Sequence, residues 1–503
     1  MKKPAKIVAL ILCVLMAGVM FIACGEKDNS TESEKKDDVN PEYIVGEDTE
    51  QSDQPADGGL VLDNLPELDF EGYDYRILYC EYGLSTPKCV FLYPEAEEGE
   101  VLNDAIYRRN QKIQERLNVN FKATTTATYD SMNILAKNVQ ADDDAYDTYM
   151  VVDREAHSLA EKGLLYPFND VPYIDLSKPY WMPEINRVIS VGNKLPYAYS
   201  DEMLSVFEHT IVLYFNKKTV ADLELEDFYG LVSTGEWTFD KFFENARAAI
   251  KNVSGSDKMS STDDYWGIVA DYGLICSYWI NAGIITVEKD ENDMPYFNLP
   301  GNERFFAVME KVFDYNAADG IYLDTESNKM PAGIGPEAGF DFFRNGHALF
   351  ALGTIQEMIT LRDMPDDFGV IPFPKYDSAQ ERYYTRLLGG RPFVIPGTNQ
   401  RPDAAGAVME AMACETRNTV FPAYYESSLK NKFSRDPESV EMLDLIREAA
   451  VWDLFIIWGQ QIGSPLANIF KSGNNTYASW IEKNEENIGR LIQKSVDAIL
   501  DKY

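Results

Sequence analysis

Carboxylates are the most abundant side chains in this chain that could carry out chemistry. The 503 residues include 82 Asp and Glu. Glycoside hydrolysis uses two carboxylates, and Asp201 and Glu202, close to Tyr197 and Tyr199, are the first pair to consider. With so many acids some pair always occurs, and solvated or hydrogen-bonded acids at a domain crossover explain these two better. A secreted glycoside-active enzyme that uses a carboxylate pair is therefore kept as the alternative function.

Other catalytic and metal-binding patterns do not occur in the sequence. His157, His209 and His347 are far apart and form no H-E-x-x-H pattern. Neither a G-x-S-x-G nor a G-x-x-x-x-G-K-[ST] motif is present. Residues 333–338 fit a loose dinucleotide-binding pattern, but a polar segment and not an apolar strand precedes them. We therefore expect no enzyme activity, no catalytic residue, no cofactor and no metal.

The first 24 residues have the pattern of an export signal. Three lysines occur within the first six residues, an uncharged apolar run extends from Ile7 to Ala23, and Cys24 and Gly25 follow. The run is long enough to be a retained membrane helix. Residues 21–25, however, resemble a bacterial lipobox, in which the cysteine is acylated, for example by palmitate, and becomes the mature N-terminus. We predict a lipoprotein signal peptide over 1–24 and a lipid-anchored protein on the extracytoplasmic face of the cell membrane.

Residues 25–65 are rich in acidic and small polar residues, which predicts a disordered acidic linker. The formal net charge of the chain is −36, which argues against a nucleic-acid partner and favours a neutral or cationic ligand. Four cysteines remain in the folded part. Cys80 and Cys89 could form a disulfide, and free buried thiols are an equally good interpretation.

The folded part alternates strand and helix patterns. Residues 73–80 predict a strand, 103–117 a helix and 119–124 a second strand, and this succession implies a crossover between parallel strands. Further strands are expected over 149–152, 210–215, 348–352, 369–372 and 392–395. Further helices are expected over 155–162, from 239, and over 304–315, 402–414, 437–450 and 479–503. Trp237, just before the N-cap Thr238, is expected to pack as a hydrophobic staple. The pattern predicts an α/β protein of at least two domains, with helices over mostly parallel sheets.

Several segments in a fixed order resemble the family 1 extracellular solute-binding proteins of ATP-driven importers, which include the maltose-binding protein. The similar segments are 146–154, 163–169, 195–199, 211–218, 235–242, 343–350, 368–374 and 389–395. For example, Tyr214 to Lys217 read "tyrosine, any, asparagine, lysine", as the end of one strand does in this family. Together these segments cover most of residues 70–460.

This resemblance implies a two-lobed periplasmic-binding-protein-like fold of type II, with discontinuous lobes joined by a hinge. The implied lobes are residues 66–203 plus 387–425 and residues 204–386 plus 426–503. The chain would cross between the lobes near Ser200 and near Leu388. A ligand that contacts both lobes would stabilise a closed state.

Ligand contacts are expected just after the carboxyl ends of the strands. These positions give Glu81 and Tyr82, Asp153 and Arg154, and Thr354 and Gln356. Ser277, Tyr278 and Trp279 resemble the aromatic cleft segment of the family. A sugar site combines rings with charged partners, so we add Trp181, Trp452, Tyr424, Asp201, Arg391 and Asp453. For each ring, a packing role is an equally good interpretation.

The resemblance thus predicts a solute-binding lipoprotein of an ABC importer that closes around a small ligand, an oligosaccharide. The expected partners are this ligand, the ABC permease subunits and, through the lipid on Cys24, the membrane, and we expect a monomer. A receptor that binds the closed complex is an alternative partner to the permease.

Overall fold

The computed structural model of the chain describes residues 59–80, 92–127, 129–260, 263–325, 337–425 and 436–503. The predicted signal peptide, Cys24 and nearly all of the predicted linker lie outside these residues. So do Glu81, Tyr82 and Cys89, whose predicted roles therefore stay predictions.

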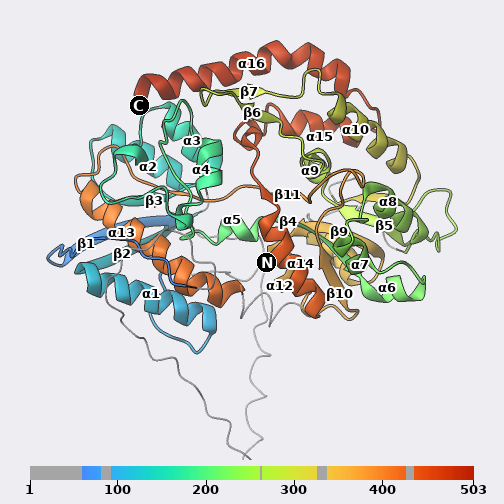
Figure 1. Ribbon diagram of the computed structural model, residues 1–503, viewed down its shortest axis with the longest axis horizontal. Coiled ribbons are helices and arrows are strands. Elements are labelled where there is room, and N and C mark those ends of the chain that lie inside the picture. Colours follow the sequence, from blue (N-terminus) through green and yellow to red (C-terminus); the bar gives the residue numbers. More distant parts are fainter. Residues whose placement is uncertain (1–58, 81–91, 128, 261–262, 326–336, 426–435) are drawn as a thin grey trace, which may run out of the picture. The chain divides into compact units, whose positions relative to one another are not determined.

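The first sheet has the strand order β12–β3–β1–β2 (Figure 1). Its strands are β1 (Tyr73–Cys80), β2 (Val119–Thr126), β3 (Thr148–Met150) and β12 (Phe393–Val394). β1 pairs in parallel with β2 over its whole length and with β3, whereas β12 runs antiparallel to β3. The predicted strand–helix–strand succession is confirmed.

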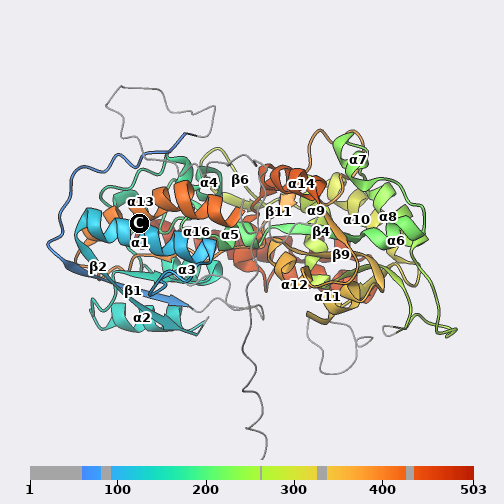
Figure 2. The ribbon, with the colours of Figure 1, turned by 90° about the horizontal axis from the view of Figure 1, so that it is seen from below.

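The helix α1 (Val101–Leu117) forms because its sequence is amphipathic. Leu102, Ile106, Ile113 and Leu117 are buried on one face. The side chain of Glu100 accepts a hydrogen bond from the backbone N–H of Asn103 at 2.9 Å and so caps the first turn. Figure 2 shows α1 and α13 (Pro402–Glu415) on one face of the first sheet and α2 (Ser131–Gln140) on the other.

The second sheet has the strand order β10–β4–β9–β5–β8. Its strands are β4 (Ile211–Asn216), β5 (Trp266–Ala270), β8 (Tyr322–Asp324), β9 (Ala348–Thr354) and β10 (Phe368–Ile371). β5 pairs in parallel with β8 and β9, but β4 is antiparallel to both β9 and β10. The expectation of a mostly parallel sheet is therefore wrong for half of these pairings. Buried strands such as β4 are apolar whichever way they run, so their sequence does not give their direction.

The predicted packing role of Trp237 is confirmed. It lies directly before the N-cap of α8 (Phe239–Ala248), and its side chain is fully buried. Its ring meets that of Phe242, in the first turns of α8, edge to face at a centroid distance of 6.0 Å. Its indole N–H donates to the carbonyl of Pro372 at 3.1 Å. This is the staple geometry that fixes the start of a helix.

Three segments between the two sheets are hydrogen-bonded to one another. β11 (Thr385–Arg386) pairs in parallel with β13 (Ala450–Val451). Thr210, just before β4, forms a bridge with Leu387. The N–H of Leu388 donates to the carbonyl of His209 at 3.1 Å. The strands before residue 203 and β12 lie in the first sheet, and β4, β5, β8, β9 and β10 lie in the second. The exact lobe boundaries stay a prediction.

The last helix, α16 (Tyr477–Lys502), packs against both parts of the molecule (Figure 1). Near its start, the ring of Tyr477 packs edge to face on Phe305 of α10 (Glu303–Asn316). Near its end, the hydroxyl of Ser495 lies 2.7 Å from Nε2 of the buried His157 in α3 (Asp153–Glu161). Among the described residues, no helix has the length and apolar character needed to cross a membrane.

Candidate functional site

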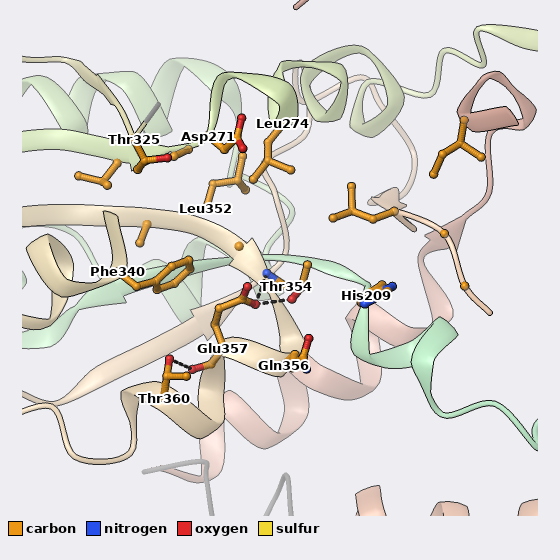
Figure 3. A pocket seen from close by; sticks show the side chains of 18 of the residues that line it. His209, Asp271, Leu274, Thr325, Phe340, Leu352, Thr354, Gln356, Glu357 and Thr360 are labelled. Atoms are coloured by element: carbon orange, nitrogen blue, oxygen red, sulfur yellow. Dashed lines mark hydrogen bonds between the residues drawn. The ribbon is translucent and has the colours of Figure 1, made fainter. Parts of the chain in front are cut away.

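A cavity of about 770 Å³ is lined by residues that lie at the ends of strands from both sheets. Figure 3 shows its wall on the side of the second sheet. Its volume falls in the range of about 300–1,000 Å³ that small-molecule sites use. Among the described residues, Tyr129 and Phe340 are the lining side chains with six-membered aromatic rings. The charged and polar lining residues are Asp153, Arg154, His209, Asp271, Thr325, Asp341, Arg344, Thr354, Gln356, Glu357, Thr360 and Arg391.

The carboxyl ends of three strands position most of these polar groups. Asp153 and Arg154 follow β3, Asp271 follows β5, and Thr354 is the last residue of β9. Ligands of open α/β sheets bind at this edge because loops and helix starts offer exposed polar groups there. The segment 388–391, which leads from the second sheet back to the first, also lines the cavity.

Asp153 is the most buried acid on the first-sheet side of the cavity, with 6% of the residue exposed. Its carboxylate accepts hydrogen bonds from the backbone N–H of Arg154 at 2.6 Å and of Gly390 at 3.4 Å. Burial raises the pKa of Asp153 to about 6, although these two hydrogen bonds oppose the shift. Gly389, at φ +133°, lies so close that a Cβ there would clash with the carboxylate. This acid of the cavity wall is thus packed directly against a segment that connects the lobes.

Arg391 forms the inner wall of the cavity and is also 6% exposed. One of its guanidinium nitrogens lies 3.5 Å from the thiol of Cys80 at the end of β1. Cys80 is a free, buried thiol whose pKa is raised by burial. The charge of Arg391 also acts on the buried Glu208, where it partly offsets the burial that raises the pKa of this acid to about 7. Arg391 therefore lines the cavity and also interacts with the buried side chains of Cys80 and Glu208.

On the second-sheet side, Thr354 and Glu357 form a local pair (Figure 3). A carboxylate oxygen of Glu357 accepts from the backbone N–H of Thr354 at 2.8 Å and from its hydroxyl. Burial raises the pKa of Glu357 and lowers that of His209 to about 4. His209 is therefore a neutral imidazole near pH 7, so the charges on the cavity wall come from carboxylates and guanidiniums.

Five of the predicted ligand contacts line this cavity. They are Asp153, Arg154, Thr354, Gln356 and Arg391. All of them were selected either by their position after a strand or as a charged partner for sugar hydroxyls. Their role in ligand binding stays a prediction.

The structure places the other predicted contacts that it describes, all but Glu81 and Tyr82, outside the cavity lining. Two tryptophans are fully buried: Trp181 donates its indole N–H to Glu410 at 2.6 Å, and Trp279 donates to the hydroxyl of Thr286 at 2.9 Å. Ser277 and Tyr278 precede Trp279 in α9 (Cys276–Asn281), and both are buried.

Four further predicted contacts also make contacts within the protein. Trp452 packs on Tyr199 at a ring distance of 5.1 Å, and Tyr424 packs on Phe207 at 6.2 Å. The carboxylate of Asp201 forms an ion pair with Arg417 at 2.6 Å. Asp453 accepts hydrogen bonds from the backbone of Thr286 and Phe455.

Tyr129, His209, Asp271, Phe340 and Glu357 line the cavity although the sequence analysis did not select them. Asp271 directly follows β5, a strand that the sequence analysis did not identify, so the same position rule applied to that strand would have found it. Tyr129 lies in the connection that follows β2, a predicted strand, so the same position rule points to this connection, although the sequence analysis did not apply it there.

The carboxylate pair considered for hydrolysis does not face this cavity. Asp201 is held by Arg417, and neither it nor Glu202 is among the lining residues. Within the described ranges, no group of three or more His, Cys, Asp or Glu side chains is arranged to hold a metal ion.

Residues 96–414 match the family of bacterial extracellular solute-binding proteins. The match covers more than half of the chain, so the protein belongs to this family. It is a family of binding proteins, not of enzymes, and its members act outside the cytoplasm. A comparison with curated protein sequences finds no match.

Solved structures with the same fold share little sequence identity with this chain. An ABC substrate-binding protein from Listeria monocytogenes in complex with cycloalternan has a TM-score of 0.54 and 13% identity, over 84% of this chain and 99% of that chain. A cyclo/maltodextrin-binding protein complexed with maltotetraose has a TM-score of 0.54 and 14% identity, over 86% and 98%. An ABC transporter associated binding protein from B. animalis subsp. lactis in complex with β-1,6-galactobiose has a TM-score of 0.51 and 13% identity, over 84% of this chain and 98% of that chain. The chain therefore has the two-lobed α/β fold of type II periplasmic binding proteins.

Proposed function

We propose that this protein captures an oligosaccharide in the cavity between its two lobes and delivers it to an ABC importer. The observation that carries the proposal is that one cavity takes charged side chains from both sheets and lies against the segment that connects them. Sugar hydroxyls need such charged hydrogen-bonding partners. The three structures above, which share this fold, bind saccharides, and this supports the choice of ligand class.

The residues proposed to contact the ligand are the five predicted ones that line the cavity. Asp153 would accept from sugar hydroxyls, and Arg154 and Arg391 would donate to them. Thr354 and Gln356 would provide contacts from the second lobe. A ligand held in this way bridges the lobes, so its binding energy favours the closed arrangement.

We further propose that the chain is exported, cleaved before Cys24 and anchored by a lipid on that cysteine. The apolar segment followed by Cys24 and Gly25 supports this proposal. Mass spectrometry of the N-terminal peptide from native membranes tests it: an acylated Cys24 is expected, and an unmodified residue 1–24 segment would contradict it. The acidic residues 25–65 would then link the anchor to the folded part, which would act as a monomer beside its permease.

Isothermal titration calorimetry of the full chain tests the proposed function. The panel contains maltotetraose, cycloalternan and β-1,6-galactobiose as saccharides, and spermidine and a tripeptide as controls. We expect one-site binding of at least one saccharide, with a Kd on the order of 1 μM, about −8 kcal/mol. Binding of only spermidine or the tripeptide would contradict the choice of ligand class.

The same samples test the enzyme alternative. After incubation, chromatography should recover each saccharide intact, because a binding protein releases its ligand unchanged. Shortened saccharides whose formation stops in an Asp201→Asn, Glu202→Gln variant would instead identify a hydrolase that uses this carboxylate pair.

A further inference from the structure

Tyr129 is an exposed aromatic residue on the wall of the cavity. It lies in the connection between β2 and α2, and 56% of the residue is exposed. Most large aromatic side chains among the described residues are buried. An exposed ring that lines a cavity with charged walls has a surface available for the apolar part of a ligand.

Arg154 contacts this ring. Its guanidinium carbon lies 5.4 Å from the centroid of the Tyr129 ring, which is the geometry of a cation–π contact. Arg154 is itself placed by the first turn of α3, next to Asp153. The ring is thereby positioned beside a guanidinium that can donate hydrogen bonds to ligand hydroxyls.

Phe340 provides a second ring from the other lobe (Figure 3). It belongs to α11 (Glu337–Arg344), is half-buried and packs edge to face on Tyr214 of β4 at 5.8 Å. It lies so close to Gly353 of β9 that a Cβ there would clash with the ring. Phe340 is thus held against the second sheet, while Tyr129 follows a strand of the first.

These two rings and the polar groups that line the same cavity fit a ligand with two kinds of surface. The ligand needs C–H faces that can pack on rings and hydroxyls that can pair with Asp153 and Arg391. Pyranose rings have both surfaces. Polyamines and acidic oligomers lack a rigid apolar face.

We propose that Tyr129 and Phe340 are specificity-determining residues, one from each lobe, that pack on the faces of a pyranose unit of the ligand. Arg154 acts as a positioning residue for the Tyr129 ring. This inference rests on the proposed function and deepens it, because it predicts which residues pack on the C–H faces of the saccharide.

Calorimetry on ring variants tests the inference, with whichever of maltotetraose, cycloalternan and β-1,6-galactobiose binds the wild type most tightly. Tyr129→Ala and Phe340→Leu should each raise Kd at least tenfold, because both remove a ring. Tyr129→Phe keeps the ring and should stay within threefold of the wild type. Tyr173→Ala is the matched control, since it removes a ring of similar exposure, 41%, that does not line the cavity.

Melting temperatures of the variants separate a lost contact from a folding defect. A purely structural role of Tyr129 would lower the melting temperature of Tyr129→Ala and leave the Kd of the folded fraction unchanged. If the wild type binds a saccharide and Tyr129→Ala binds it equally well, the ring inference is overturned and the proposed function stands. If the wild type binds spermidine or the tripeptide and no saccharide, both are overturned.

Discussion

Several buried acids of this protein are protonated more readily in the folded state than in the unfolded chain. Glu202 is the simplest case, because its Oε2 has no hydrogen-bond partner among the described residues. Burial raises its pKa from 4.5 to about 7, and Arg109 offsets only part of this shift. Between these two pKa values the folded state binds more protons than the unfolded chain. The contribution of Glu202 to the free energy of unfolding is therefore fully present below pH 4.5 and is lost as pH rises through 7. Asp201, Glu208 and Glu410 shift in the same direction.

We therefore expect the wild type to be less stable to urea at pH 8 than at pH 5.5. Glu202→Gln removes one titrating group and should reduce this difference by on the order of 2 kcal/mol. Glu184→Gln, at an exposed position in α4 (Pro183–Ile189), is the control and should leave the difference unchanged. Equal pH dependence of the wild type and Glu202→Gln would show that Glu202 is ionised in the folded protein throughout this range.

At the residue level, sequence position identified polar residues of the cavity wall better than aromatic ones. Asp153 and Thr354 were found because each lies at the end of a strand that the sequence identifies. Trp181 and Trp279 were chosen as rings for sugar, but both are fully buried with their indole N–H groups bonded inside the protein. A tryptophan in a core and one in a cleft have the same local sequence pattern, so only tertiary contacts distinguish them.

At the level of elements, the segment 387–390 connects the ligand cavity to the contacts between the lobes. Its Leu387 and Leu388 pair with the segments before β4 and at β13, and its Gly389 and Gly390 pack against Asp153. If Asp153 binds the ligand as proposed, the ligand contacts a residue that packs directly on this segment, and we expect the backbone of the segment to rotate during closure.

Gly389→Ala should weaken saccharide binding, since a Cβ at φ +133° is strained and would clash with the carboxylate of Asp153. We expect a stability loss on the order of 1–3 kcal/mol and a clear rise in Kd, measured by urea unfolding and calorimetry. Gly397→Ala is the matched control, because a Cβ there meets only ordinary contacts with Leu164. An unchanged Kd in a folded Gly389→Ala protein would argue against coupling between this segment and the site.

Most elements of the fold could be predicted from the sequence, because their apolar spacing is regular. The strands β1, β4 and β9 and the helices α13 and α16 lie within a few residues of their predicted positions. The antiparallel direction of β4 could not be predicted, since all six of its residues are buried and show no alternation.

For the molecule as a whole, the contacts between the lobes are concentrated in a few segments. The hydrogen-bonded crossings connect the sheets, and α16 packs on α10 with its first turn and on α3 with its last turns. The hairpin of β6 (Val287–Lys289) and β7 (Pro295–Phe297) adds a further connection, because Ser190 donates to Asp293 at 2.8 Å. We expect closure to be a rotation that preserves these contacts and narrows the cavity.

Small-angle X-ray scattering of the full chain, with and without a saturating saccharide, tests the central claim most directly. The saccharide is the one from the calorimetry panel that binds the wild type most tightly. If one ligand is trapped between two hinged lobes, the radius of gyration decreases on binding, and the decrease saturates at one saccharide per chain. An unchanged radius of gyration at full occupancy would contradict the account.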